Sequence, residues 1–222
     1  MVRSFDELAT LPFAEGVNAL CWPRTLTGDF AEIVASLGRV EGILTLDTAR
    51  LASLPLSPSG RAAADILLAD AQRLRSHGLS PELNCLAAYP RDDAPGPVPL
   101  DVYSFHADSA TVETDTWLCT YFGAPSEALR NEDARRCIDL PPTRAALLAE
   151  YGGRDDTDFL RWLHEHCYDL HYAPLPHAQP FSFGVGHLWR IAVDYPGSPV
   201  PPCIHRAPAT PPGQPPRLLL IS

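Results

Sequence analysis

The sequence predicts a mainly β protein with α-helical additions, on three observations. Short apolar runs broken by proline and glycine follow one another from about residue 81 onward, which is typical of strands. Two segments with apolar residues at helical spacing precede these runs, and two more fall between about residues 126 and 172. The 222 residues are enough for one sizeable core, and no stretch has the composition of a flexible tether, so we expect a single domain over residues 1–222.

Residues 1–80 are predicted to be the N-terminal helical part. Residues 29–37 carry apolar side chains at helical spacing and stop at Gly38, which predicts an amphipathic helix. A longer, alanine-rich helix is expected from Ser59 to Gly78, because alanine favours the helix and glycine commonly ends it. Neither helix carries a group of reactive side chains.

The β core is predicted over residues 81–222, with a helical insertion at about residues 126–172. Residues 100–105 form a strand-like run that leads into His106, and residues 116–121 form a second run. A last apolar run starts at Arg217 and ends near the C-terminus. Within the insertion, residues 143–150 and 158–168 have helical patterns, so the insertion separates His106 from the last strands.

Charge and composition exclude several classes of partner. The chain has 27 acidic residues against 17 basic ones, all of them arginine, and its net charge is −10. This balance repels phosphate backbones and anionic membranes, so we expect no nucleic acid and no membrane among the partners. No apolar run approaches the roughly 20 residues that cross a bilayer, and the first residues lack a signal-peptide core, so we expect a cytoplasmic protein. The six cysteines have no CxxC spacing and are expected to be free thiols.

His106, Asp108 and His205 are the candidate metal ligands. Alternate residues of a strand project from one face, so His106 and Asp108 would point into one barrel mouth while a later strand brings in His205. Two histidines and one carboxylate form the facial triad of non-haem Fe(II) oxygenases, which leaves three coordination positions open. Two of these would take a chelating 2-oxo acid, and the third would take dioxygen.

Arg217 is the candidate for binding the carboxylate of a cosubstrate. An arginine near the end of a neighbouring strand can hold the distal carboxylate of 2-oxoglutarate as a bidentate pair. Arg206 is a possible substitute for this role. Trp117, Cys119 and Tyr121 would share one strand face, where Trp117 and Tyr121 either line the substrate pocket or belong to the barrel core. A small molecule is the expected substrate, since no peptide-binding repeat or charged groove is evident.

A second set of possible ligands is His164, Cys167 and His171, which would share a helical face at i, i+3 and i+7. Zinc binds such side chains, although no CxxC or CxxH pair completes the set. Other common sites are missing from the sequence: it has no Gly-x-Ser-x-Gly elbow, no Gly-x-Gly-x-x-Gly fingerprint and no lysine for a phosphate-binding loop. We therefore favour the two-histidine, one-carboxylate set.

Several segments resemble the bacterial family called domain of unknown function 1826. The similar segments are residues 18–24 (Asn-Ala-Leu-Cys-Trp-Pro-Arg), 105–108 (Phe-His-Ala-Asp), 118–125 (Leu-Cys-Thr-Tyr-Phe-Gly-Ala-Pro), 204–208 (Ile-His-Arg-Ala-Pro) and 217–220 (Arg-Leu-Leu-Leu). They extend over most of the chain. The chain departs from the family at residues 112–116, where the family has an arginine-rich stretch, and at Ala124 and Ser126, where the family tends to have glycines. A shared substrate therefore does not follow, and the family name carries no activity.

More distantly, the order His-x-Asp, His, Arg is similar to the 2-oxoglutarate-dependent oxygenases, whose fold is a double-stranded β-helix, a jelly-roll or cupin-like barrel. This resemblance implies such a barrel here, with the helices added to it. It also implies an Fe(II)-dependent dioxygenase that oxidises a C–H bond of a small-molecule substrate. Two alternatives stay open: a mononuclear metal-dependent oxygenase that does not use 2-oxoglutarate, and a non-catalytic metal-binding protein.

Overall fold

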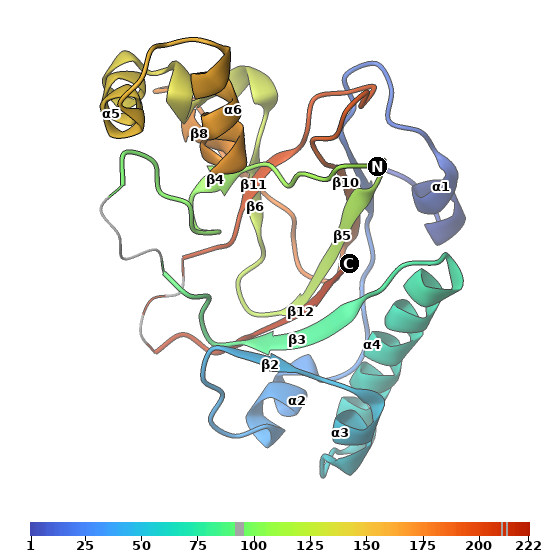
Figure 1. Cartoon of the computed structure of the whole chain (residues 1–222). Coiled ribbons are helices and arrows are strands. Elements are labelled where there is room, and N and C mark those ends of the chain that lie inside the picture. Colours follow the sequence, from blue (N-terminus) through green and yellow to red (C-terminus); the bar gives the residue numbers. More distant parts are fainter. Residues whose placement is uncertain (92–95, 210, 212) are drawn as a thin grey trace.

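The computed structural model describes residues 1–91, 96–209, 211 and 213–222 (Figure 1). The fold is mixed α/β and contains two six-stranded antiparallel sheets, one of them curled into a half-barrel, in an arrangement consistent with a β-sandwich. The strands of sheet A, in spatial order, are β1 (Ala19–Trp22), β10 (Leu188–Ala192), β5 (Asp115–Phe122), β12 (Arg217–Ile221), β3 (Glu82–Leu86) and β2 (Ile43–Thr45). Those of sheet B are β7 (Ala134–Arg136), β8 (His171–Pro174), β4 (Phe105–His106), β11 (Ile204–Arg206), β6 (Glu127–Leu129) and β9 (Phe181–Ser182).

Six α-helices flank the sheets in the described part of the chain. They are α1 (Phe5–Thr10), α2 (Phe30–Ser36), α3 (Thr48–Ser53), α4 (Pro58–Ser76), α5 (Pro141–Tyr151) and α6 (Thr157–Glu165), with short 3-10 turns at Asn131–Asp133, Cys137–Asp139 and Tyr168–Leu170. The helices α2, α3 and α4 lie below sheet A, whereas α5 and α6 lie at the opposite end of the molecule, beside sheet B (Figure 1). None of the helices in the described ranges has both the length and the apolarity to span a bilayer.

Side-chain caps define the first residues of the helices α2 and α4. Asp29 caps α2 by accepting a hydrogen bond from the Glu32 amide, and Ser57 caps α4 in the same way with Gly60. The carboxylate of Glu32 also accepts hydrogen bonds from the amide and the hydroxyl of Ser57, which ties the two helices together. The two predicted N-terminal helices are thus confirmed, with α4 ending two residues before Gly78.

The main core lies between sheet A and the N-terminal helices, on what we call the helix face of the sheet. Alternation along each strand sends every second side chain to this face. Its strand residues include Leu20, Trp117, Cys119, Tyr121, Leu188, Leu218 and Leu220. The opposite side, here the inner face, looks toward sheet B. Its residues Leu118 and Ile191 form a smaller apolar cluster with Ala128 of β6, Phe183 and Cys203. His106, His205 and Arg217, described below, lie on this inner side.

Three parts of the strand pattern differ from the sequence-based expectation. The N-terminal part is not only helical, because it contributes β1 and β2 to sheet A. The insertion is not only helical either, because β6, β7 and β8 fall within or at the end of it. The strand before the metal ligands is short: β4 has only two residues, and residues 101–104 form turns and bends. In each case the strand is formed by pairing with a distant segment, which a local pattern does not record.

Candidate metal centre

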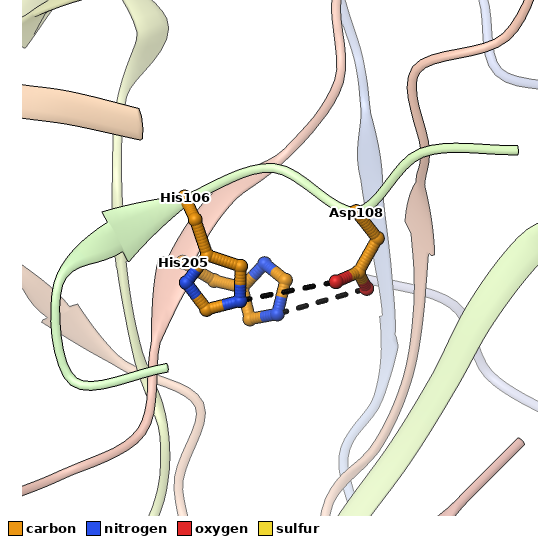
Figure 2. Close-up of side chains that lie close together, drawn as sticks. All are labelled: His106, Asp108 and His205. Atoms are coloured by element: carbon orange, nitrogen blue, oxygen red, sulfur yellow. Dashed lines mark ion pairs between the residues drawn. The ribbon is translucent and has the colours of Figure 1, made fainter. Parts of the chain in front are cut away.

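Two neighbouring strands of sheet B bring the three predicted ligands together. His106 on β4 and His205 on β11 are direct cross-strand partners, so their side chains lie on the same face. Asp108 follows β4 and turns its carboxylate toward both rings, as Figure 2 shows. Residues 97 positions apart, Asp108 and His205, thereby come within reach of a single ion.

The three side chains form a compact group. Nε2 of His106 lies 3.8 Å from Oδ1 of Asp108, and Nε2 of His205 lies 3.8 Å from Oδ2 of the same carboxylate (Figure 2). One donor atom from each residue lies within 4.8 Å of the other two. Since bonds of about 2.1 Å hold adjacent ligand atoms roughly 3 Å apart, a small inward movement would bring all three onto an ion. The His-Asp-His group could therefore hold a metal ion.

Hydrogen bonds hold both imidazole rings in the tautomer that a metal needs. Nδ1 of His106 lies 2.9 Å from the carbonyl oxygen of Ser104, and Nδ1 of His205 lies 3.3 Å from that of Cys203. A carbonyl oxygen only accepts, so each Nδ1 carries the proton and each Nε2 presents a lone pair toward Asp108. Backbone carbonyls are common partners of metal-binding histidines.

Burial and one hydrogen bond define the surroundings of His205 and Asp108. Burial lowers the pKa of His205, an effect that the nearby Asp108 carboxylate partly opposes. The hydroxyl of Thr116, on the inner face of β5, donates a 2.5 Å hydrogen bond to Oδ2 of Asp108. This bond fixes the carboxylate from the sheet A side. Asp108 is also the most accessible of the three, with a third of its side chain exposed.

Arg217, the predicted carboxylate-binding residue, lies on the inner face of sheet A and is 2% exposed. Its Nη2 lies 3.4 Å from the hydroxyl oxygen of Thr120 and 3.1 Å from that of Ser126. Its buried Nε has no hydrogen-bond partner among the described residues. Among the described residues, no carboxylate lies within ion-pair distance of the guanidinium. A buried cation with only neutral partners leaves room for an anionic ligand.

The surroundings of Arg217 keep it in place but do not neutralise it. Burial lowers its pKa, while the nearby phenols of Tyr89 and Tyr103 act in the opposite direction. Gly123, with a φ of +83°, lies against its backbone, and a Cβ there would come within 3.1 Å of the Cα of Arg217. The glycine in the turn after β5 is therefore needed for this close approach.

Arg206, the possible substitute, already has a partner. It follows His205 on β11 and so projects from the opposite face of sheet B. Its Nε and Nη2 donate to Oε2 of Glu127 at 2.9 and 2.6 Å, and its guanidinium lies over the ring of Phe105. Arg217 and not Arg206 therefore remains the candidate for the anion.

Of the two alternatives for Trp117 and Tyr121, the structure supports the core and not the substrate pocket. The two side chains do share a strand face with Cys119, but it is the helix face, where Trp117 lies against Phe5 and Tyr121 stacks on Phe30. They belong to the core and do not line the space around the triad. The alternation of side chains along β5 defines two faces but does not say which of them the helices cover. The inner face of β5 carries Thr116, Leu118 and Thr120.

The alternative zinc set does not assemble. Helix α6 ends at Glu165, Cys167 has a left-handed φ of 59°, and His171 begins strand β8, so the three side chains do not share a helical face. His164 contacts Asp169 at 3.0 Å instead. Within the described residues, the triad is the one group of three or more such side chains close enough to share an ion. All six cysteines are free thiols, as expected.

Sequence reasoning missed His171 as a neighbour of the metal centre. It is the cross-strand partner of His106, and the two ring centroids lie 5.8 Å apart. Burial, together with the nearby His106, lowers the pKa of His171 to about 4. The roles of Thr116, Thr120 and Ser126 were missed as well. No local pattern marks them, because each acts on a residue far away in the sequence.

A groove of about 1000 Å³ opens at the edge where β1 and β10 approach β6 and β9. Its lining includes Ala19, Asn131, Trp189 and Cys203, but none of the triad residues. The lining residue Cys203 contacts the triad through its carbonyl oxygen, which lies 3.3 Å from Nδ1 of His205.

Comparisons of this chain with protein-family models, with curated proteins and with solved structures gave no match.

Proposed function

We propose that this protein is a non-haem Fe(II)-dependent oxygenase that uses 2-oxoglutarate and dioxygen to oxidise a C–H bond of a small-molecule substrate. The proposal includes the double-stranded β-helix fold and membership of the domain of unknown function 1826 family, to which the motifs are similar. One observation carries it: a fully buried arginine without a described carboxylate partner lies on the same inter-sheet side as a His-Asp-His group that could hold a metal. A structural metal site alone would have no use for such an arginine.

Each residue has a defined role in this proposal. His106, Asp108 and His205 bind the ion through Nε2, a carboxylate oxygen and Nε2, and leave one side of it open. Arg217 binds the distal carboxylate of 2-oxoglutarate, with its unpaired Nε as one of the donors. Bound Fe(II) would supply the oxidation of R–H by dioxygen to R–OH, coupled to the conversion of 2-oxoglutarate to succinate and carbon dioxide.

The spacing along β5 supports a ligand that joins the two sites. Thr116 contacts the triad through Asp108, and Thr120 contacts Arg217, both from the inner face of the same strand. Four residues of extended strand span roughly 13 Å. A five-carbon dicarboxylate, with a metal bond at one end and a hydrogen bond at the other, bridges a distance of this order once the side chains reach inward.

An anaerobic titration tests the proposal. Fe(II)-loaded protein is titrated with 2-oxoglutarate, and the weak visible charge-transfer band of the iron-chelated 2-oxo acid is followed. We expect a saturable band in the wild-type protein. In Arg217→Met the affinity should fall by about 100-fold, because a charge-assisted bidentate contact is lost.

Two controls make the result specific. Arg206→Met removes an arginine of the same sheet region that is paired with Glu127, and it should leave the titration unchanged. Pyruvate lacks the distal carboxylate and should bind equally weakly to wild type and Arg217→Met. Iron binding without any band, in the wild-type protein, would contradict the use of 2-oxoglutarate and favour an oxygenase that does not need it or a metal-binding protein without turnover.

A further inference from the structure

A row of three histidines crosses sheet B beside the metal centre. Strands β8, β4 and β11 are neighbours, and His171, His106 and His205 are successive cross-strand partners. Directly paired residues project from the same face, so all three rings face the space between the sheets. The centroid of the His106 ring lies 5.8 Å from that of His171 and 4.7 Å from that of His205. His171, which is 6% exposed, extends the row by one ring beyond the triad.

Ser104 holds His106 and His171 through different atoms. Its carbonyl oxygen accepts from Nδ1 of His106, and its hydroxyl oxygen lies 2.9 Å from Nδ1 of His171. The hydroxyl has a single proton, which it donates to the carbonyl oxygens of Asp101 and Pro99 at 2.7 and 3.1 Å. The hydroxyl oxygen therefore accepts from His171, so Nδ1 of the buried, neutral ring carries the proton.

The second nitrogen of His171 is left with a lone pair. Within the described part of the chain, no hydrogen bond to Nε2 of this residue is found. The lone pair of this nitrogen is therefore free to accept a hydrogen bond from a bound molecule. The donor atoms of the triad lie within 4.8 Å of one another, whereas His171 is not part of that group, so its position fits a contact with a metal-bound molecule better than a bond to the metal itself.

We propose that His171 is a further residue of the binding site, which accepts a hydrogen bond through Nε2 from a hydroxyl group or water molecule bound at the open side of the metal. The inference rests on the metal centre of the proposed function, but not on 2-oxoglutarate or Arg217. The favoured ligands are those that keep an O–H donor next to the metal-binding atom. A ligand without such a donor would leave Nε2 unsatisfied and bind more weakly.

The test uses Co(II)-loaded protein and two matched chelators. Glycolate binds a metal through its carboxylate and hydroxyl oxygens, and methoxyacetate binds in the same way without the O–H donor. Co(II) absorption reports both the binding of each chelator and the coordination of the metal. We expect the wild-type protein to favour glycolate over methoxyacetate, and His171→Phe to reduce this ratio about fivefold, as for the loss of one hydrogen bond. His171→Gln retains an acceptor and should restore part of the ratio.

Several outcomes would overturn the proposal. An unchanged ratio in His171→Phe, with Co(II) still bound, would show that His171 does not contact the ligand. Loss of Co(II) from a folded His171→Phe would make His171 a metal ligand, and a wild-type protein that takes up no Co(II) would remove the contact altogether. Because neither chelator has a distal carboxylate, a protein that discriminates between them but ignores 2-oxoglutarate would support His171 and contradict the proposed oxygenase.

Discussion

Each side of sheet A has a buried arginine, and the two arginines differ in whether a carboxylate pairs with them. On the helix face, Arg24 has 8% of its side chain exposed and forms a 2.7 Å ion pair with Asp70, which is itself 1% exposed. On the inner face, Arg217 is equally buried, yet its guanidinium contacts only neutral groups among the described residues. Both cations are removed from water, but only one has a permanent counter-charge.

The pKa directions follow this difference. Burial opposes the charge on both arginines. Around Arg24, the groups of Cys119, Asp70 and Tyr121 more than offset burial and raise the pKa, whereas burial prevails at Arg217 and lowers the pKa. On the helix face, the protein itself supplies the carboxylate that neutralises the buried arginine. On the inner face, Arg217 has no carboxylate partner among the described residues, as expected of a site that binds an anion.

The largest expected effect is the loss of metal affinity when Asp108 is replaced. Asp108→Ala removes the one charged ligand of the triad, and metal affinity should fall by more than about 100-fold. The fold should lose little stability, because Asp108 is partly exposed. Metal content after dialysis, measured by mass spectrometry, checks this. The matched control is Asp194→Ala. Asp194 is the β-bridge partner of Ser109, so this variant removes a nearby carboxylate that is outside the triad, and it should retain the metal.

Asp70→Asn should show the reverse pattern. It leaves Arg24 buried without its counter-charge, which costs about 3 kcal/mol in the free energy of unfolding. For a chain of this length, the melting temperature would fall by roughly 10 °C. Metal binding should be unchanged, because Asp70 lies on the helix face. A variant that melts normally would show that the ion pair is not what stabilises Arg24.

Thr116→Val tests the support that the inner face gives to the triad. The substitution conserves shape and removes the hydrogen bond to Asp108, so metal affinity should decrease about tenfold. Metal titration by calorimetry measures the change. Thr10→Val removes a hydroxyl that bonds only to a helix carbonyl at the protein surface, and its metal affinity should equal that of the wild type.

Arg217→Met tests by stability alone whether Arg217 lacks the structural partner that Arg24 has. Replacing an uncompensated buried cation by an apolar side chain of similar length should leave the ligand-free protein as stable as the wild type, or more stable by about 1 kcal/mol. Urea denaturation measures this difference. A loss of 3 kcal/mol or more would mean that Arg217 has a structural partner and is not reserved for a ligand.

A last difference, which affects neither metal binding nor stability, concerns the thiols. Burial raises the pKa of Cys119 on the helix face to about 12, whereas Cys167 is exposed. At pH 8 the thiolate fraction of Cys119 would be roughly a thousandfold below that of an ordinary cysteine. Iodoacetamide should therefore modify Cys167 and spare Cys119 until the protein unfolds, as peptide mass spectrometry can show. Early modification of Cys119 would mean that the helix face opens to water.

The sequence identified the three side chains that lie close together better than it identified their surroundings. His106 and Asp108 are recognisable because a two-residue spacing next to a strand places both on one side, and Arg217 because it starts a clear apolar strand. The face occupied by Trp117 and Tyr121 was not predictable, since alternation does not say which side the helices cover. His171 was placed on a helix because the helical pattern before it continues past Glu165, where the structure ends the helix.

The most direct test of the difference between the two faces is ligand-linked stability. Wild type, Asp70→Asn and Arg217→Met are unfolded in urea with Mn(II), with and without 2-oxoglutarate. At a concentration about 100 times the wild-type dissociation constant, 2-oxoglutarate should stabilise wild type and Asp70→Asn by about 2.7 kcal/mol, and Arg217→Met, with its roughly 100-fold weaker affinity, by only about 0.4 kcal/mol. Equal stabilisation of all three proteins, or of none, would contradict the assignment of the inner face as the site of the anion.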